Sequence, residues 1–151
     1  MEFLSTEIGV KIKVQNPFPL PSYASLGASG LDVCAHLATP LFFKPLERHL
    51  IPTGIFVELP LGYEFQVRPR SGLALKRGLT VLNTPGTIDA DYRGEIKIIL
   101  ANLSSEITNI EPGERIAQLV LAKVEKLMWI PQNELSETER ADQGFGSTGM
   151  K

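Results

Sequence analysis

The feature that most constrains this chain is the alternation of apolar and polar residues at every second position, in short runs that end at turn residues. Residues 10–14, 55–59 and 63–68 alternate in this way, and turn sequences such as Pro60-Leu61-Gly62 and Glu111-Pro112-Gly113 separate the runs. A period of two is that of a half-buried β-strand, and Pro and Gly mark turns between strands. Residues 71–77 alone have the pattern of a helical turn. The sequence therefore predicts an all-β domain, such as a sandwich or barrel.

Two later segments, residues 96–100 and 119–122, lose this alternation and are apolar on both faces. A strand that is apolar on both faces needs cover on both sides. Either a partner subunit or a tightly closed single sandwich would provide that cover, and the residues alone leave both open.

Length and composition limit the remaining classes. A chain of 151 residues fits one domain, and few apolar residues follow position 132, so we expect a β domain at 1–132 and a flexible arm at 133–151. The net charge of -2 is not that of a nucleic-acid binder. One cysteine, no leader pattern and no membrane-length apolar stretch lead us to expect a cytoplasmic protein that binds neither membrane nor nucleic acid directly.

Several common sites are missing from the sequence. It has no Walker-type glycine loop, no Cys-x-x-Cys and no His-Glu-x-x-His, and His36 and His49 lack zinc-ligand spacing. Metalloprotease, structural-zinc and P-loop interpretations are therefore not supported.

A candidate anion site lies in the segment Arg68-Pro69-Arg70-Ser71-Gly72-Leu73-Ala74. Arg70 offers a planar fork of donors, Ser71 a hydroxyl, and Gly72 a backbone N–H that an anion can approach closely. These groups are suited to phosphate oxygens. A solvated turn with incidental arginines explains the segment equally well.

A second candidate segment, residues 83–95, carries the carboxylates Asp89, Asp91 and Glu95. Beside a bound triphosphate, a carboxylate can orient and deprotonate a water molecule. The segment also fits the acidic rim of a hairpin with its turn at Pro85-Gly86.

Three further segments carry isolated polar residues. Asp32 stands at the start of an expected strand, and Gln118 interrupts an apolar one, where it needs a hydrogen-bond partner if buried. In the tail, Arg140 and Phe145 lie in a run broken by glycines.

Taken in order over residues 28–149, these five segments resemble the five signature motifs of the trimeric dUTPases (deoxyuridine 5'-triphosphate nucleotidohydrolases). The second motif, residues 69–74, and the third, residues 86–95, are the most specific. The resemblance implies a β jelly roll that forms a homotrimer, with three active sites that each use all three subunits.

The resemblance also implies hydrolysis of dUTP to dUMP and pyrophosphate by Mg²⁺-assisted attack of water on the α-phosphate. Such an activity limits uracil incorporation into DNA and supplies dUMP for thymidylate synthesis. Asp89 is expected to activate the water, and Asp32 to reach Mg²⁺ through a water while the substrate phosphates hold the ion. The residues expected to bind substrate are Arg70, Ser71, Gly72, Asn83, Gly86, Thr87, Ile88, Tyr92, Lys97, Gln118, Arg140, Phe145, Gly146, Ser147 and Thr148.

Within that set, the resemblance assigns phosphate contacts to the second motif and to Gln118 of the fourth, residues 113–119. It assigns further phosphate contacts to Arg140, Ser147 and Thr148, and uracil contacts to residues 83–89. Tyr92 is expected to stack under the deoxyribose and to clash with a 2′-hydroxyl. The arm is expected to close over the nucleotide, with Phe145 stacking on uracil. The fifth motif departs from the family at Ala141 and Gln143, where glycines are usual, so we expect each Cβ to affect closure where φ is positive.

Two other functions are alternatives for this sequence. A dCTP deaminase of the same superfamily would need a different carboxylate and a base site for cytosine. A catalytically inactive nucleotide-binding trimer would need neither Asp89 nor Tyr92.

Overall fold

The computed structural model describes residues 7–15 and 17–145, and nearly all of its regular structure is β-strand. The strands are β1 (Lys11–Val14), β2 (Leu31–Cys34), β3 (Leu41–Phe43), β4 (Arg48–Pro52), β5 (Ile55–Glu58), β6 (Tyr63–Arg68), β7 (Leu79–Val81), β8 (Gly86–Ile88), β9 (Lys97–Asn102), β10 (Thr108–Ile110) and β11 (Arg115–Lys123). The helix α1 (Ser71–Arg77) occupies the residues expected to form a helical turn. The all-β prediction is confirmed.

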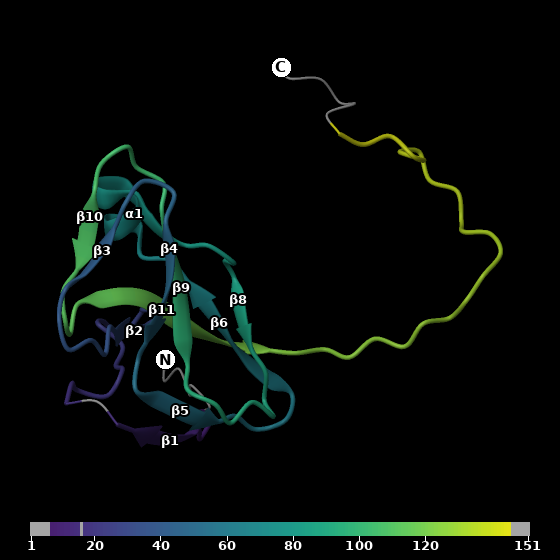
Figure 1. Cartoon of the computed structure of the whole chain (residues 1–151). Coiled ribbons are helices and arrows are strands. Elements are labelled where there is room, and N and C mark those ends of the chain that lie inside the picture. The colour runs from purple at the N-terminus through teal and green to yellow at the C-terminus, as the bar shows by residue number, and fades with distance from the viewer. Residues whose placement is uncertain (1–6, 16, 146–151) are drawn as a thin grey trace.

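The strands form antiparallel sheets in which sequence neighbours are rarely spatial neighbours. The four-stranded sheet has the order β2-β11-β6-β8 and the three-stranded sheet the order β4-β9-β7, and β1-β5 and β10-β3 form separate pairs. These crossovers between sheets make a jelly roll. Figure 1 shows the strands wrapped around a common centre, with α1 at one end.

The buried side chains come from almost every strand and fill this centre. On β6, Phe65 and Val67 are buried whereas Arg68 is exposed, as the alternation predicts. The edge strand β1 is an exception, because its Ile12 stays 42% exposed. The largest fully buried side chains are those of Phe43, Ile51, Leu79, Ile96, Ile98, Leu100, Ile110, Ile116 and Leu119.

Helix α1 is placed by the residues at its two ends. Arg70 precedes it in extended conformation, with φ -97° and ψ 126°. Gly78 ends the helix at φ 65°, and its N–H donates to Ala74 O at 3.2 Å. The buried Leu73 fixes the helix to the core. Arg70, Ser71 and Gly72 therefore lie together at the start of the helix.

The two strands without alternation are not covered on both faces by the single chain. On β9, Ile98 and Leu100 are buried while Ile99 is half-exposed, and on β11 Val120 and Leu121 are half-exposed beside the buried Leu119. A single closed sandwich therefore leaves one face of each strand partly open.

The expected hairpin around Pro85-Gly86 is wrong. β7 pairs with β9, whereas β8 pairs with β6, so residues 82–85 carry the chain from one sheet to another. The apolar residues of β7, Leu79 and Val81, are both buried against β9 and the core, and this packing takes β7 away from β8. The residues flanking the turn thus belong to different sheets.

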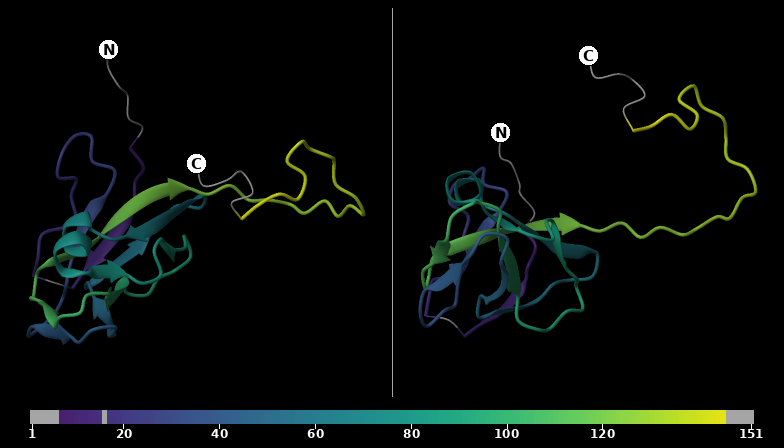
Figure 2. Two further views of the ribbon diagram at one scale, coloured as in Figure 1. Left: turned by 90° about the horizontal axis from the view of Figure 1, so that it is seen from above. Right: turned by 45° about the horizontal axis from the view of Figure 1, so that its top comes forward.

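The chain leaves the β domain shortly after β11. The N–H of Val124 still donates to Gly62 O at 2.8 Å, but residues 125–143 are all exposed. Figure 2 shows this segment extending away from the strands in both views. The boundary between residues 132 and 133 stays a prediction. No helix in the described part of the chain is long and apolar enough to cross a membrane.

Candidate functional site

The start of α1 meets β2 and β11 at a hollow of about 310 Å³. Pro69 and Arg70 carry the chain from β6 to the helix, and β11 pairs with both β2 and β6. This pairing brings three separate sequence segments to one place. The predicted residues that line the hollow are Asp32, Arg70, Ser71, Gly72 and Gln118.

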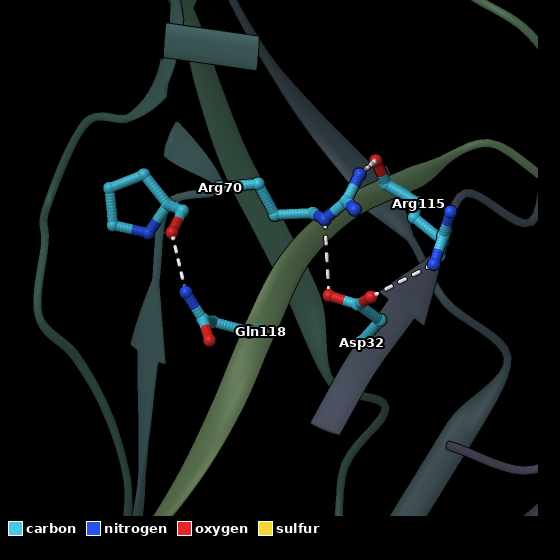
Figure 3. A network of polar contacts seen from close by, with 5 residues as sticks. Asp32, Arg70, Arg115 and Gln118 are labelled. Atoms are coloured by element: carbon cyan, nitrogen blue, oxygen red, sulfur yellow. Dashed lines mark hydrogen bonds and ion pairs between the residues drawn. The ribbon is translucent and has the colours of Figure 1, made fainter. Parts of the chain in front are cut away.

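Asp32 holds two arginines at the edge of this hollow. Arg70 donates from Nε to Asp32 Oδ1 at 3.1 Å, and Arg115 donates from Nη1 to Oδ2 at 3.3 Å. Arg70 Nη1 also donates to the carbonyl oxygen of Arg115 at 3.3 Å. Figure 3 shows the carboxylate between the two guanidinium groups. Because the Asp32 side chain is only 25% exposed, its charge is partly shielded from water and fixes the orientation of Arg70.

Gln118 finds its partner in the loop before α1. Its Nε2 donates to Pro69 O at 3.0 Å, as Figure 3 shows, and its backbone pairs with Asp32 on one side and Arg68 on the other. The side chain lies against Gly30, where a Cβ would come within 3.1 Å of Gln118 Cβ and Cδ. The amide nitrogen of this polar residue in an apolar strand therefore has a partner, and the side chain is held beside the hollow.

A second hollow, of about 570 Å³, lies around Tyr92. The Tyr92 hydroxyl donates to Glu95 O at 2.9 Å, and the backbone N–H of Tyr92 donates to Asp89 O at 3.1 Å. These two hydrogen bonds hold the ring in place. The residues that line this hollow are Leu50, Thr87, Ile88, Asp89, Tyr92, Gly94, Glu95, Lys97 and Ile99.

Two other predicted residues lie at the start of β8, outside that lining. Gly86 is buried opposite Val67, and a Cβ on it would come within 3.2 Å of Asn83 Nδ2. Asn83 is exposed. The structure therefore places Asn83 beside Gly86, at the end of β8 that is far from Asp89.

The three carboxylates of this segment are not equivalent. Glu95 Oε1 accepts the N–H of Gly54 at 2.8 Å, and its Oε2 lies 3.8 Å from Lys97 Nζ. Glu95 is thus engaged in holding the strands together. Asp89 and Asp91 are exposed, and Asp89 lines the hollow beside Tyr92.

Within one chain, Asp89 and Arg70 lie at opposite ends of β6. Ile88 pairs with Phe65, and Arg70 follows Phe65 by five residues of extended chain. At about 3.3 Å per residue, roughly 15–20 Å separate the Asp89 end of β8 from Arg70. The two hollows therefore do not form a single pocket in one chain.

The described residues offer neither a cluster of metal ligands nor a reactive cysteine. No three His, Cys, Asp or Glu side chains within residues 7–15 and 17–145 gather as a metal-binding group. Burial raises the pKa of the Cys34 thiol, although the guanidinium of Arg115 lowers it in part. The thiol is therefore protonated near neutral pH and a poor nucleophile.

The arm extends away from the strands and α1 (Figure 1). Arg140 Nε donates to Gln143 O at 2.8 Å within a local turn, and the Phe145 side chain is fully exposed. Ala141 has φ 47°, in the region that favours glycine, whereas Gln143 does not have positive φ. Only one of the two departures therefore adds a Cβ at positive φ. The predicted residues Gly146, Ser147 and Thr148 lie outside the described residues.

The sequence pattern did not indicate two features. One is Arg115, which pairs with Cys34 and reaches Asp32 because the register of β11 shifts between Arg115 and Ala117, and no local sequence signal predicts that shift. The exposed apolar residues Leu127, Met128, Trp129 and Ile130 were also overlooked, and Trp129 is 82% exposed. Four consecutive large apolar residues in a polar tail were the available signal.

One hollow lined by Arg70 and a second lined by Asp89, Tyr92 and Glu95 lie on the same jelly roll, which places the chain among the jelly-roll β proteins. A family model described as dUTPase matches residues 16–149, and the chain belongs to the dUTPase family.

Relatives match along almost the whole chain. A deoxyuridine 5'-triphosphate nucleotidohydrolase of Bdellovibrio bacteriovorus is 61% identical over 95% of this chain and 97% of its own length. Another, from Hydrogenobaculum sp., is 58% identical over 92% of this chain and 96% of its own. Among solved structures, the dUTPase of Staphylococcus bacteriophage 80alpha, as the G164S mutant with dUpNHpp, superposes with a TM-score of 0.83. The two sequences are 26% identical, and the superposition covers 94% of this chain and 99% of the phage protein.

Proposed function

We propose that this protein hydrolyses dUTP to dUMP and pyrophosphate, which limits uracil incorporation into DNA and supplies dUMP for thymidylate synthesis. The observation that carries the proposal is the arginine-lined hollow at α1 together with an exposed Asp89 beside Tyr92. The relatives named as deoxyuridine 5'-triphosphate nucleotidohydrolases support the same activity.

The triphosphate is bound in the hollow at the start of α1. The guanidinium of Arg70, oriented by Asp32, supplies charged donors, and Ser71 and Gly72 supply a hydroxyl and a backbone N–H. Gln118 completes the lining. An excess of donors over acceptors suits a group that carries several negative oxygens.

The nucleoside is bound along β8 and in the hollow around Tyr92. Asn83 and the backbone of Gly86, Thr87 and Ile88 read the uracil edge. Tyr92 stacks under the deoxyribose and excludes a 2′-hydroxyl, and Lys97 lies at the border of the same hollow.

Asp89 acts as the general base. It takes a proton from the water whose oxygen attacks the α-phosphorus, and the bond from that phosphorus to the bridging oxygen breaks. Pyrophosphate leaves with the electron pair. Glu95 is a weaker candidate, because Gly54 and Lys97 already engage its carboxylate.

The donor set fits Mg²⁺ bound mainly by substrate. This ion is commonly held by one or two carboxylates, waters and substrate phosphates. Asp32, partly exposed at the hollow at the start of α1, would reach the ion through a water while its two oxygens still accept from Arg70 and Arg115. The bound ion would neutralise phosphate charge.

The functional unit is a homotrimer. The gap between Asp89 and Arg70 is too long for one chain to activate water at a phosphate it also binds, so a neighbouring chain supplies the missing half. The half-exposed Ile99 and Val120 and the exposed Leu127–Ile130 segment offer apolar surface for such contacts. The arm then contributes Arg140, Phe145, Gly146, Ser147 and Thr148 to the closed site.

A cytoplasmic location is part of the proposal, and the free thiol of Cys34 suits a reducing compartment.

A parallel assay tests the activity. Pyrophosphate release from dUTP, dCTP, dTTP and UTP is measured with Mg²⁺ and with EDTA. We expect efficient turnover of dUTP alone, suppressed by EDTA. Ammonia release from dCTP would favour the deaminase, and no turnover of any nucleotide would favour the inactive trimer.

A further inference from the structure

Gly94 lies directly against the ring of Tyr92 in the second hollow. A Cβ built on Gly94 would stand 2.5 Å from Tyr92 Cζ and 2.9 Å from Cε2, with the hydroxyl oxygen nearer still. Carbon atoms in contact are separated by about 3.5–4.0 Å. Any side chain at position 94 therefore requires the ring to move.

The backbone does not explain this glycine. The described glycines with left-handed φ are Gly54, Gly62, Gly78 and Gly113, and Gly94 is not one of them. An alanine could adopt the same backbone conformation. The absence of a side chain at position 94 therefore matters because it leaves space for the Tyr92 ring.

The ring has little freedom to give way while keeping its contacts. The Tyr92 hydroxyl donates to Glu95 O at 2.9 Å, and the Tyr92 N–H donates to Asp89 O at 3.1 Å. Both ends of the residue are thereby tied to the turn that carries Gly94. Moving the ring breaks the hydrogen bond of the hydroxyl and changes the shape of the hollow.

We infer that Gly94 and the carbonyl of Glu95 form a seat for the Tyr92 ring, which makes Gly94 a positioning residue for discrimination at the sugar. The inference rests on the proposed function, in which Tyr92 stacks under the deoxyribose. A displaced ring no longer presses against the 2′ position, and a ribonucleotide then fits.

The test compares kcat/KM for dUTP and UTP in wild type, Gly94→Ala, Tyr92→Ala and the double variant. We expect Gly94→Ala to lower the dUTP/UTP ratio by about tenfold, within the range that one hydroxyl commands. In the Tyr92→Ala background the same substitution should change the ratio no further, because Gly94 acts only through the ring. Gly9→Ala, which adds a Cβ with nothing within 4 Å, should keep the wild-type ratio.

Two results would overturn the inference: a wild-type ratio in Gly94→Ala, or an equal fall of the ratio with and without the Tyr92 ring. A wild type that hydrolyses dUTP and UTP alike would instead contradict the role proposed for Tyr92. If Gly94→Ala does not fold, Tyr92→Phe tests the seat, because it keeps the ring but loses the bond to Glu95. A lowered ratio supports the seat, and an unchanged ratio refutes it.

Discussion

Asp32 accepts a hydrogen bond from Nε of Arg70 at 3.1 Å, and this contact joins the first sequence motif to the second. The two residues come from β2 and from the loop before α1, which are distant in sequence. The same carboxylate also holds Arg115, so one charge orients both guanidinium groups.

Replacing Asp32 with Asn removes that charge with little change of shape. We expect the Mg²⁺ concentration for half-maximal activity to rise about tenfold. Loss of a group that contacts a metal only through one of its ligands typically weakens metal binding by about that factor. A metal titration of initial rates measures this. Glu58→Gln, which alters an exposed carboxylate paired with Lys11 at 2.9 Å, is the control and should leave the titration unchanged. An Asp32→Asn titration equal to that of wild type would show that Asp32 serves only the fold.

Gly30→Ala tests the placement of Gln118. A Cβ at position 30 would meet Gln118 Oε1 and come within 3.1 Å of its Cβ and Cδ, so the side chain must shift from the position in which Nε2 donates to Pro69 O. We expect weaker binding of triphosphate, seen as a KM for dUTP raised about tenfold, the effect of losing one charge-assisted or well-placed contact. Gly9→Ala is again the matched control. An unchanged KM would remove Gln118 from the phosphate site.

Asp89→Asn should lower kcat by about 10²–10⁴-fold, because the amide keeps the shape of the carboxylate but cannot accept a proton. Binding of the non-hydrolysable analogue dUpNHpp, measured by calorimetry, should persist. Asp91→Asn should stay within a few-fold of wild type. The reverse pattern would make Asp91 the base.

The arm prediction concerns Arg140–Ala141, a trypsin site in the exposed tail. Cleavage should be fast without ligand and slowed by dUpNHpp with Mg²⁺, because Phe145 then gains a base to stack on, worth about 1–3 kcal/mol. The clipped protein should lose most activity, and Phe145→Ala part of it. Full activity after complete clipping would show that the arm takes no part in catalysis.

The sequence predicted the alternating strands β1, β5 and β6, and α1, because alternation and turn residues are local signals. It did not predict β3, β4 or β10. It also predicted that Arg70, Asp32 and Gln118 serve one site, since the family motifs carry that information. The hairpin at Pro85-Gly86 failed because β7 and β8 pair with distant strands, and no local pattern encodes that choice. For a similar reason the sequence could not predict that Gly94 leaves space for Tyr92 or that Gly30 leaves space for Gln118. A glycine in sequence does not say which side chain fills the space above it.

Mixed oligomers test whether Asp89 of one chain and Arg70 of a neighbouring chain form one site. Asp89→Asn and Arg70→Ala chains are co-expressed with different affinity tags and purified over both. In a cyclic trimer containing both variants, one of the three sites combines an intact Asp89 with an intact Arg70 from a neighbouring chain. We predict about a third of wild-type dUTP turnover, against almost none for either variant alone. Mixed oligomers no more active than the separate variants would contradict a site shared between subunits.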